Sequence, residues 1–201
     1  MITRIENWID NQSRWLVIGG CFVLFALLYV PPNYFSLFTV RELPFILGES
    51  RIPFLLWTVP VYVSVLVQIV VGLVFVLKGR LGRVIVVSTI LVSGHVVVFW
   101  FFPTILHRTH EVVGPDWLVR GYGILCQADQ PLNCFPSLHV SLAFFVGLVL
   151  WHEERWKGAL FLLWAVAIAA ATMTTKQHYL LDVVGGAVTA TIAYYAYRWG
   201  L

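Results

Sequence analysis

Charged residues are scarce in this chain of 201 residues. Asp, Glu, Lys and Arg make up 11% of it, whereas hydrophobic residues make up 60%; soluble domains usually carry about 25% charged residues. The mean hydropathy is +0.84. So few charges cannot cover the surface of a fold in water, which excludes an ordinary soluble protein. We predict an integral membrane protein.

A concentrated basic face and a polar linker are also missing. The formal net charge is only +3, and the Lys and Arg residues are scattered along the chain. Nucleic-acid binding needs a clustered basic surface, so we expect no nucleic-acid partner. Since no Ser-rich or highly charged stretch divides the chain, we predict one membrane domain over residues 1–201.

Long apolar runs are abundant, and about 20 such residues cross the hydrocarbon core of a bilayer. Lipid offers no partner for unpaired backbone groups, so each run is expected to be helical. The fourth and fifth runs are short. We therefore predict an all-α bundle of six transmembrane helices, with these approximate spans: Trp15–Phe35, Phe54–Leu77, Val84–Phe102, Ser137–Trp151, Ala159–Thr175 and Tyr179–Trp199.

The distribution of Lys and Arg predicts the orientation of these spans. An even number of spans places both termini on one side, and eight of the 13 Lys and Arg residues fall on that side. The short turn "KGRLGR", residues 78–83, holds three of them. Positive charge in short loops favours the cytoplasm. We expect cytoplasmic termini, and the compact size and short loops favour a bacterial inner membrane.

The outward-facing ends then hold most of the polar chemistry. His178 and Asp182 are four residues apart in "KQHYLLD", so on a helix they share one face and the carboxylate can accept the imidazole Nδ1 proton. Nε2 would then be free to act as a nucleophile. The alternative is a pair that only joins two spans, because an ionisable residue within an apolar run needs a partner.

A second polar site opens the fourth span in "PSLH", where Pro136 and Ser137 suit the first turn of a helix. The free amides and the helix dipole there attract anions, within reach of His139. A helix start with an interfacial histidine is the alternative. Arg108 and Lys176 lie in the outward loops, so two histidines, two cations and a carboxylate meet at one membrane face. This composition is typical of a phosphate site.

The stretches "FPTILHR", "PSLH" and "KQHYLLD" together resemble the three signatures of the type 2 phosphatidic acid phosphatase superfamily, over residues 102–182. The resemblance implies His178 as the nucleophile and Asp182 as its orienting carboxylate. It implies His139 as the general acid, with Ser137 and Arg108 as phosphate ligands.

The sequence departs from the family pattern at several positions. Leu138 stands where the family has glycine, Thr109 follows Arg108 where the family has proline, and the Ser-Arg pair of the third signature falls on Ala171 and Thr172. Lys176 is expected to supply the missing charge, although as a point charge and not a bidentate fork. These variants resemble the branch containing inositol phosphorylceramide and sphingomyelin synthases.

Three functions stay open at this point. The first is a lipid phosphatase or diphosphatase at the extracytoplasmic face, acting through a phosphohistidine. The second is a lipid phosphotransferase that uses the same histidine with an alcohol acceptor. The third is a non-catalytic transporter or scaffold. In each case the partners are the membrane and, for the enzymes, a lipid phosphate.

We expect no cofactor and no metal, because several carboxylates do not accompany the basic groups. The sequence does not indicate an oligomeric state.

Three structural details are also open. Cys126 and Cys134 share an outward loop, and they are either disulfide-bonded or free. His95, within the third span, is either a hydrogen-bonded core histidine or part of the site. Gly185 and Gly186 begin a stripe of small residues on the sixth span, which predicts close packing of the last two spans.

Overall fold

The computed structural model describes residues 2–42, 51–108 and 111–200. Within these residues, five helical segments are long and apolar enough to cross a membrane. Four are single helices, and the fifth runs from a short 3-10 helix through two α-helices. They are α2 (Arg14–Tyr34), η2–α3–α4 (Leu56–Thr58, Val59–Val63 and Val65–Phe75), α5 (Leu81–Phe101), α8 (Arg155–Thr174) and α9 (Leu180–Trp199).

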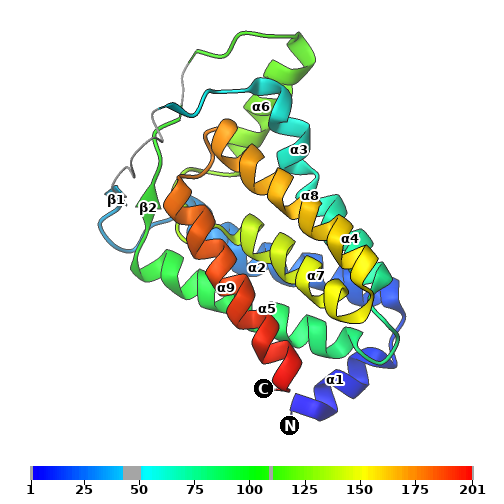
Figure 1. The fold of residues 1–201 in the computed structure, drawn as a ribbon. Coiled ribbons are helices and arrows are strands. Elements are labelled where there is room, and N and C mark those ends of the chain that lie inside the picture. Colours follow the sequence, from blue (N-terminus) through cyan, green and yellow to red (C-terminus); the bar gives the residue numbers. More distant parts are fainter. Residues whose placement is uncertain (1, 43–50, 109–110, 201) are drawn as a thin grey trace.

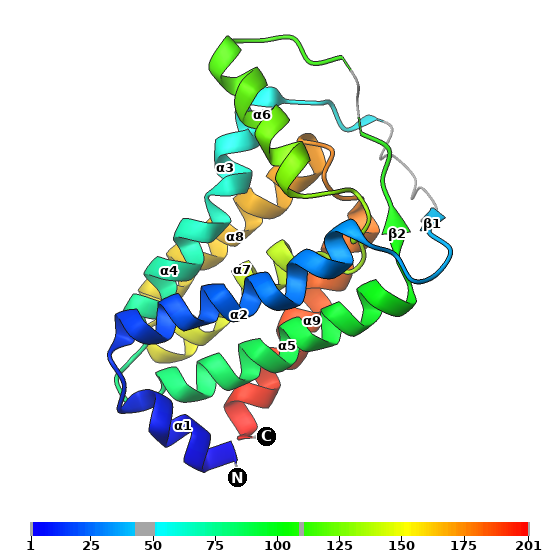
Figure 2. The ribbon, with the colours of Figure 1, turned by 180° about the vertical axis from the view of Figure 1, so that it is seen from behind.

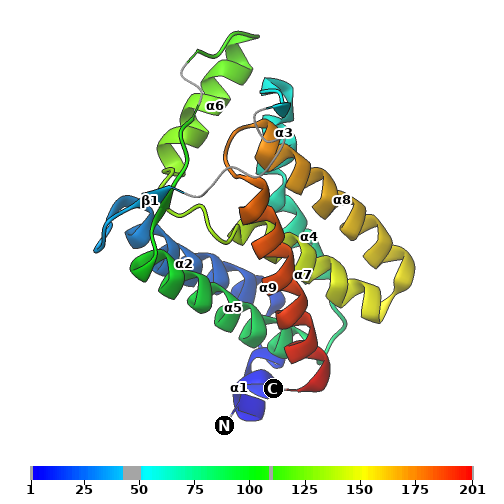
Figure 3. The same cartoon turned by 60° about the vertical axis from the view of Figure 1, so that its left-hand side comes forward.

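The fourth predicted span, Ser137–Trp151, corresponds to α7 (Leu138–Glu153), which is shorter than the other five helical segments. It lies between α8 and α9 and also contacts α4 and α5 (Figures 1 and 3). Val140, Ala143, Phe145 and Val149 on this helix have no exposed surface. Protein therefore surrounds α7 on most sides, and a helix so placed has little contact with lipid.

The helix ends differ from the predicted spans by a few residues. The first span was predicted as Trp15–Phe35, and α2 ends one residue earlier, at Tyr34. The helix continues through Pro31 and Pro32. The second span changes helix at Ser64, where the Ser64 hydroxyl donates to the carbonyl oxygen of Val61 at 2.6 Å. Trp164 of α8 donates its indole N–H to the same hydroxyl at 2.8 Å. This contact fixes the break against α8.

Among the described residues, α1 and α6 are the α-helices that lie outside the predicted spans. α1 (Ile2–Asp10) packs against the start of α5 beside the C-terminal end of α9, so both ends of the described chain lie at one end of the bundle (Figure 1). α6 (Asp116–Ala128) lies at the opposite end (Figure 2). There, strands β1 (Arg41–Glu42) and β2 (Thr104–Ile105) pair in parallel.

The small residues of α9 pack against α7. A Cβ atom on Gly186 would lie 2.6 Å from the carbonyl oxygen of Ser137 and 3.0 Å from the Cβ of Val140. Only glycine permits this approach. The expectation that this stripe joins the last two spans is therefore wrong, because α7 inserts between α8 and α9.

Candidate active site

A tight turn joins α8 to α9 and positions His178. Lys176 has a φ of +54°, in the left-handed region. The carbonyl oxygen of Thr172 accepts the backbone N–H groups of Gln177 at 2.9 Å and His178 at 3.2 Å. The chain thus reverses directly after α8, and His178 is held by the buried end of that helix.

The pair predicted from the four-residue spacing is present in the structure. His178 Nδ1 lies 3.3 Å from Asp182 Oδ2, and the same carboxylate oxygen accepts the backbone N–H of Tyr179 at 2.8 Å. Asp182 is fully buried and His178 is 7% exposed. Asp182 is the third residue of the first turn of α9, where a carboxylate is favoured by the free amides and the helix dipole. The imidazole orientation is therefore fixed, and Nε2 has no partner among the described residues.

Ser137 is the N-cap of α7, and Pro136 precedes the cap instead of lying in the first turn. The Ser137 hydroxyl is 3.4 Å from the backbone N of Val140, from which it accepts a hydrogen bond. The amides of Leu138 and His139 have no acceptor among the residues that the structure describes. These two amides remain available to an anion at the helix start.

His139 faces His178 from the first turn of α7. The two ring centroids are 6.0 Å apart, with an angle of 58° between the ring planes. The Tyr62 hydroxyl lies 3.3 Å from each ring nitrogen of His139. Two histidines from separate segments, the α8–α9 turn and the start of α7, therefore face each other.

Arg108 reaches the same region from the loop after β2. Its Nη2 donates to Gln177 Oε1 at 2.6 Å and to the backbone carbonyl of Asp129 at 2.5 Å, and Nη1 donates to the carbonyl of Cys126 at 3.1 Å. Nε is buried without a partner among the described residues. The guanidinium joins the loop before α7 to Gln177, the neighbour of His178. Thr109, which departs from the family pattern, lies outside the described residues.

Lys176 is directed to the other side of the turn. Its Nζ donates to the carbonyl oxygen of Ile52 at 2.6 Å. To contact a phosphate, the ammonium would have to give up its hydrogen bond to this carbonyl oxygen or bind the phosphate in addition to it. The assignment of Lys176 as a phosphate ligand stays a prediction.

A carboxylate that the sequence analysis did not select lies beside His139. Asp129, which follows α6, accepts hydrogen bonds from the Tyr29 hydroxyl at 2.6 Å and from the Tyr62 hydroxyl at 2.8 Å, one on each oxygen. Burial raises the pKa of Asp129, but the nearby His139 and the two tyrosine hydroxyls outweigh this effect and lower the pKa below its ordinary value of 3.8. Asp129 is a carboxylate at neutral pH.

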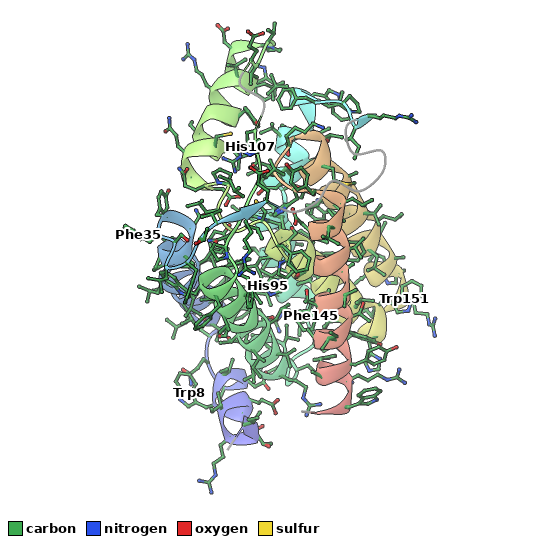
Figure 4. All side chains as sticks on the ribbon, turned by 90° about the vertical axis from the view of Figure 1, so that its left-hand side faces the viewer. Trp8, Phe35, His95, His107, Phe145 and Trp151 are labelled. Atoms are coloured by element: carbon green, nitrogen blue, oxygen red, sulfur yellow. The ribbon has the colours of Figure 1, made fainter. Side chains whose placement is uncertain are left out.

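The three open structural details are answered by the structure. His95 is buried, with Nδ1 2.9 Å from the carbonyl oxygen of Leu91 and Nε2 2.9 Å from the Ser141 hydroxyl, and Figure 4 places it in the middle of the bundle. It is a hydrogen-bonded core histidine. Cys126 and Cys134 are free thiols. The small stripe of α9 packs on α7, as described above.

The arrangement can orient a nucleophilic imidazole, place a second imidazole opposite it and offer free amides to an anion. Among the described residues, no group of three or more His, Cys, Asp or Glu side chains is placed to hold a metal ion. A reaction that does not require a metal stays a prediction.

The comparisons with known proteins agree with the signatures noted in the sequence. No curated protein and no solved structure matches the chain. Residues 50–196 match a family described as the PAP2 superfamily. This match covers most of the chain and includes His139, His178 and Asp182, and this integral membrane protein therefore belongs to the PAP2 superfamily.

Proposed function

We propose that this protein is a lipid phosphatase that acts at the extracytoplasmic face of the membrane through a phosphohistidine on His178. Members of the PAP2 superfamily are phosphoester hydrolases or transferases. The observation that carries the proposal is the facing pair of histidines: His178, oriented by Asp182, lies opposite His139 at a helix start with free amides.

In the first step, His178 Nε2 attacks phosphorus, and the bond between phosphorus and the lipid oxygen breaks. His139 transfers a proton to that oxygen, so the lipid leaves as an alcohol. Asp182 stabilises the positive charge on His178 and keeps Nε2 directed at phosphorus. The amides at the start of α7, the Ser137 hydroxyl and Arg108 hold the phosphoryl oxygens, which supplies positioning and charge stabilisation.

In the second step, water attacks phosphorus on the opposite side from His178. His139, now neutral, takes a proton from this water, the bond between Nε2 and phosphorus breaks, and inorganic phosphate leaves. Both histidines return to their starting states.

The orientation rests on the positive-inside rule. Arg80, Arg83 and Arg198 line one polar pocket at the end of the bundle that holds both termini. This end suits the cytoplasm, and the two site histidines, His139 and His178, lie at the opposite end. A bacterial inner membrane remains part of the proposal.

A lipid phosphotransferase is the second candidate. His178 and Asp182 are nearly inaccessible to solvent, and an apolar groove reaches His139. A second lipid alcohol could therefore replace water as the acceptor. The "PSLH" and "KQHY" variants, which resemble the synthases of sphingolipid headgroup transfer, favour the same activity.

The test uses purified protein in detergent with chelator present. Phosphatidic acid, a polyprenyl diphosphate and a phospholipid are supplied separately, and free phosphate and new phospholipids are measured for the wild type, His178→Ala and His178→Gln. The phosphatase proposal expects phosphate release that falls about 10³-fold or more in both variants. Headgroup transfer without phosphate release would identify a transferase. Turnover that survives both substitutions would contradict either enzyme.

A further inference from the structure

An apolar groove of about 360 Å³ leads into the membrane-spanning part of the protein from His139. Its walls come from α2, α4, α5 and α7, and almost all of them are aliphatic or aromatic. Phe22, Leu24 and Leu66 line the groove and are also exposed on the surface of the bundle. The groove is therefore bordered by lipid-facing surface.

The groove runs along the direction of the helices. Its wall on α4 extends from Val65 to Leu73, about 12 Å at 1.5 Å per residue. An apolar channel of this length inside a bilayer suits a hydrocarbon chain.

His139 and Asp129, together with Tyr29, are polar side chains that line this groove, and His139 connects it to the site. Tyr29 and Tyr62 donate to the two oxygens of Asp129, and Tyr62 is also 3.3 Å from the ring nitrogens of His139. The carboxylate, two phenols and one imidazole thus form a connected group. The pKa of Asp129 is below its ordinary value, so Asp129 itself carries a negative charge at neutral pH.

The position of the groove indicates which part of the substrate it holds. His139 lines it, whereas His178, Ser137 and Arg108 do not. Phosphorus must lie between His178 and His139, so the part of the substrate beyond His139 enters the groove. That part is the leaving group, which His139 protonates.

The charge at the groove end then limits the leaving group. After His139 gives up its proton it is neutral, and the leaving group faces the carboxylate of Asp129. A neutral alcohol is tolerated there. A lipid phosphate, which is the leaving group when a lipid diphosphate is cut, is itself an anion and would be repelled.

We propose that the groove between α2 and α4 binds the hydrocarbon chain of the leaving group, and that Asp129 restricts that group to a neutral lipid alcohol. The phosphorus that His178 attacks is then bonded directly to the oxygen of the lipid alcohol. The terminal phosphorus of a lipid diphosphate does not meet this condition. This inference rests on the proposed function. In the transferase reaction the acceptor alcohol would enter by the same groove after the first alcohol has left.

The test compares two lipids with identical chains, dioleoyl phosphatidic acid and dioleoylglycerol diphosphate. We expect the wild type to favour the monophosphate by at least about tenfold in kcat/KM, which corresponds to about 1.4 kcal/mol. In Asp129→Asn, this preference should shrink or reverse. Because the preference is a ratio within one preparation, a loss of folded protein does not change it.

A second pair of variants tests the groove. Ile69 lines it, and Val67 on the same helix is outside the lining and 55% exposed. Ile69→Trp should raise KM for phosphatidic acid relative to KM for p-nitrophenyl phosphate, which carries no chain, by about tenfold or more. Val67→Trp should leave that ratio as in the wild type.

The hydrolysis of p-nitrophenyl phosphate tests the proposed function separately from the groove. The proposed function expects this activity in the wild type and its loss in His178→Ala. If this activity is present but the wild type cuts the diphosphate as well as the monophosphate, the restriction by Asp129 is wrong while the phosphatase stands. Equal KM ratios for the two tryptophan variants would overturn the assignment of the groove. If no phosphate is released from any substrate, the proposed function fails, and this inference fails with it.

Discussion

The backbone N–H of Ser137 donates to the backbone carbonyl of Asp182 at 3.0 Å. This one hydrogen bond joins the residue that caps α7 to the carboxylate residue that orients His178 at the start of α9. Glycine at position 186 lets the two helices approach closely enough for it. The distance between the two histidines is thereby set by the packing of α7 on α9.

Removing the carboxylate charge at position 182 should impair catalysis more than folding. Asp182→Asn keeps the shape of the side chain but stabilises a charged His178 poorly. It also permits the His178 tautomer that carries its proton on Nε2, which cannot attack phosphorus. We expect kcat for phosphate release to fall about 10²- to 10⁴-fold. Asp116→Asn, the same change at an exposed position on α6, is the control. A kcat within about twofold of the wild type for Asp182→Asn would contradict the orienting role of this carboxylate.

The role of His139 as the general acid predicts a dependence on the leaving group. Phosphatidic acid releases a poor leaving group that needs a proton, whereas p-nitrophenyl phosphate releases a stable phenolate. In His139→Gln, the kcat for phosphatidic acid should fall about 10²- to 10⁴-fold, and that for p-nitrophenyl phosphate should fall much less. Steady-state rates for both substrates provide the measurement. An equal loss for the two would assign His139 a role in binding instead of proton transfer.

The contact of α9 with α7 predicts a cost for any side chain at position 186. In Gly186→Ala, the new Cβ would lie 2.6 Å from the Ser137 carbonyl oxygen, so the helices must separate. We expect a loss of stability of about 1–3 kcal/mol and lower activity, measured by thermal unfolding in detergent and by phosphate release. Gly94→Ala on α5 is a matched control, because its Cβ would meet nothing within 4 Å. Equal effects of the two substitutions would show that the contact is unimportant.

The lowered pKa of Asp129 predicts how stability depends on pH. A carboxyl group whose folded pKa lies below its unfolded value contributes stability that is present above the unfolded pKa and is lost as pH falls through the folded pKa. The ordinary value here is 3.8. The difference in Tm between the wild type and Asp129→Asn should therefore be constant from neutral pH to about pH 5 and shrink below about pH 4. A difference that begins to shrink near pH 6 would mean that the pKa is raised.

Several local features of the site followed from the sequence. The spacing of His178 and Asp182 predicted their contact, which the structure confirms, although His178 lies in the turn before the N-cap Tyr179 and not on the helix itself. The "PSLH" stretch marked a helix start. Both are properties of a few neighbouring residues, so the structure could place them only slightly differently, with Pro136 moved one position before the cap. The signatures also pointed to the PAP2 superfamily, which the match over residues 50–196 confirms.

The residues that complete the site did not follow from the sequence. Asp129 lies in a loop that shows no pattern, and its partners Tyr62 and Tyr29 are 67 and 100 residues away in the chain. The packing of α9 on α7, contrary to expectation, likewise depends on which helix fills the centre of the bundle. A one-dimensional pattern does not encode such distances, because they arise when the helices pack together.

The sequence by itself determined that this chain belongs in a membrane, that its polar chemistry gathers at one face and that His178 and Asp182 form a pair. Hydropathy and a four-residue spacing are sufficient for these conclusions, because they act locally along each helix. Only the tertiary structure decided that the short α7 is central and that His139 faces His178. The tertiary structure also decided that Tyr62 connects Asp129 to His139 at the end of an apolar groove. These relationships depend on side-chain volume and hydrogen bonding between helices far apart in sequence, which are fixed only when the whole bundle packs.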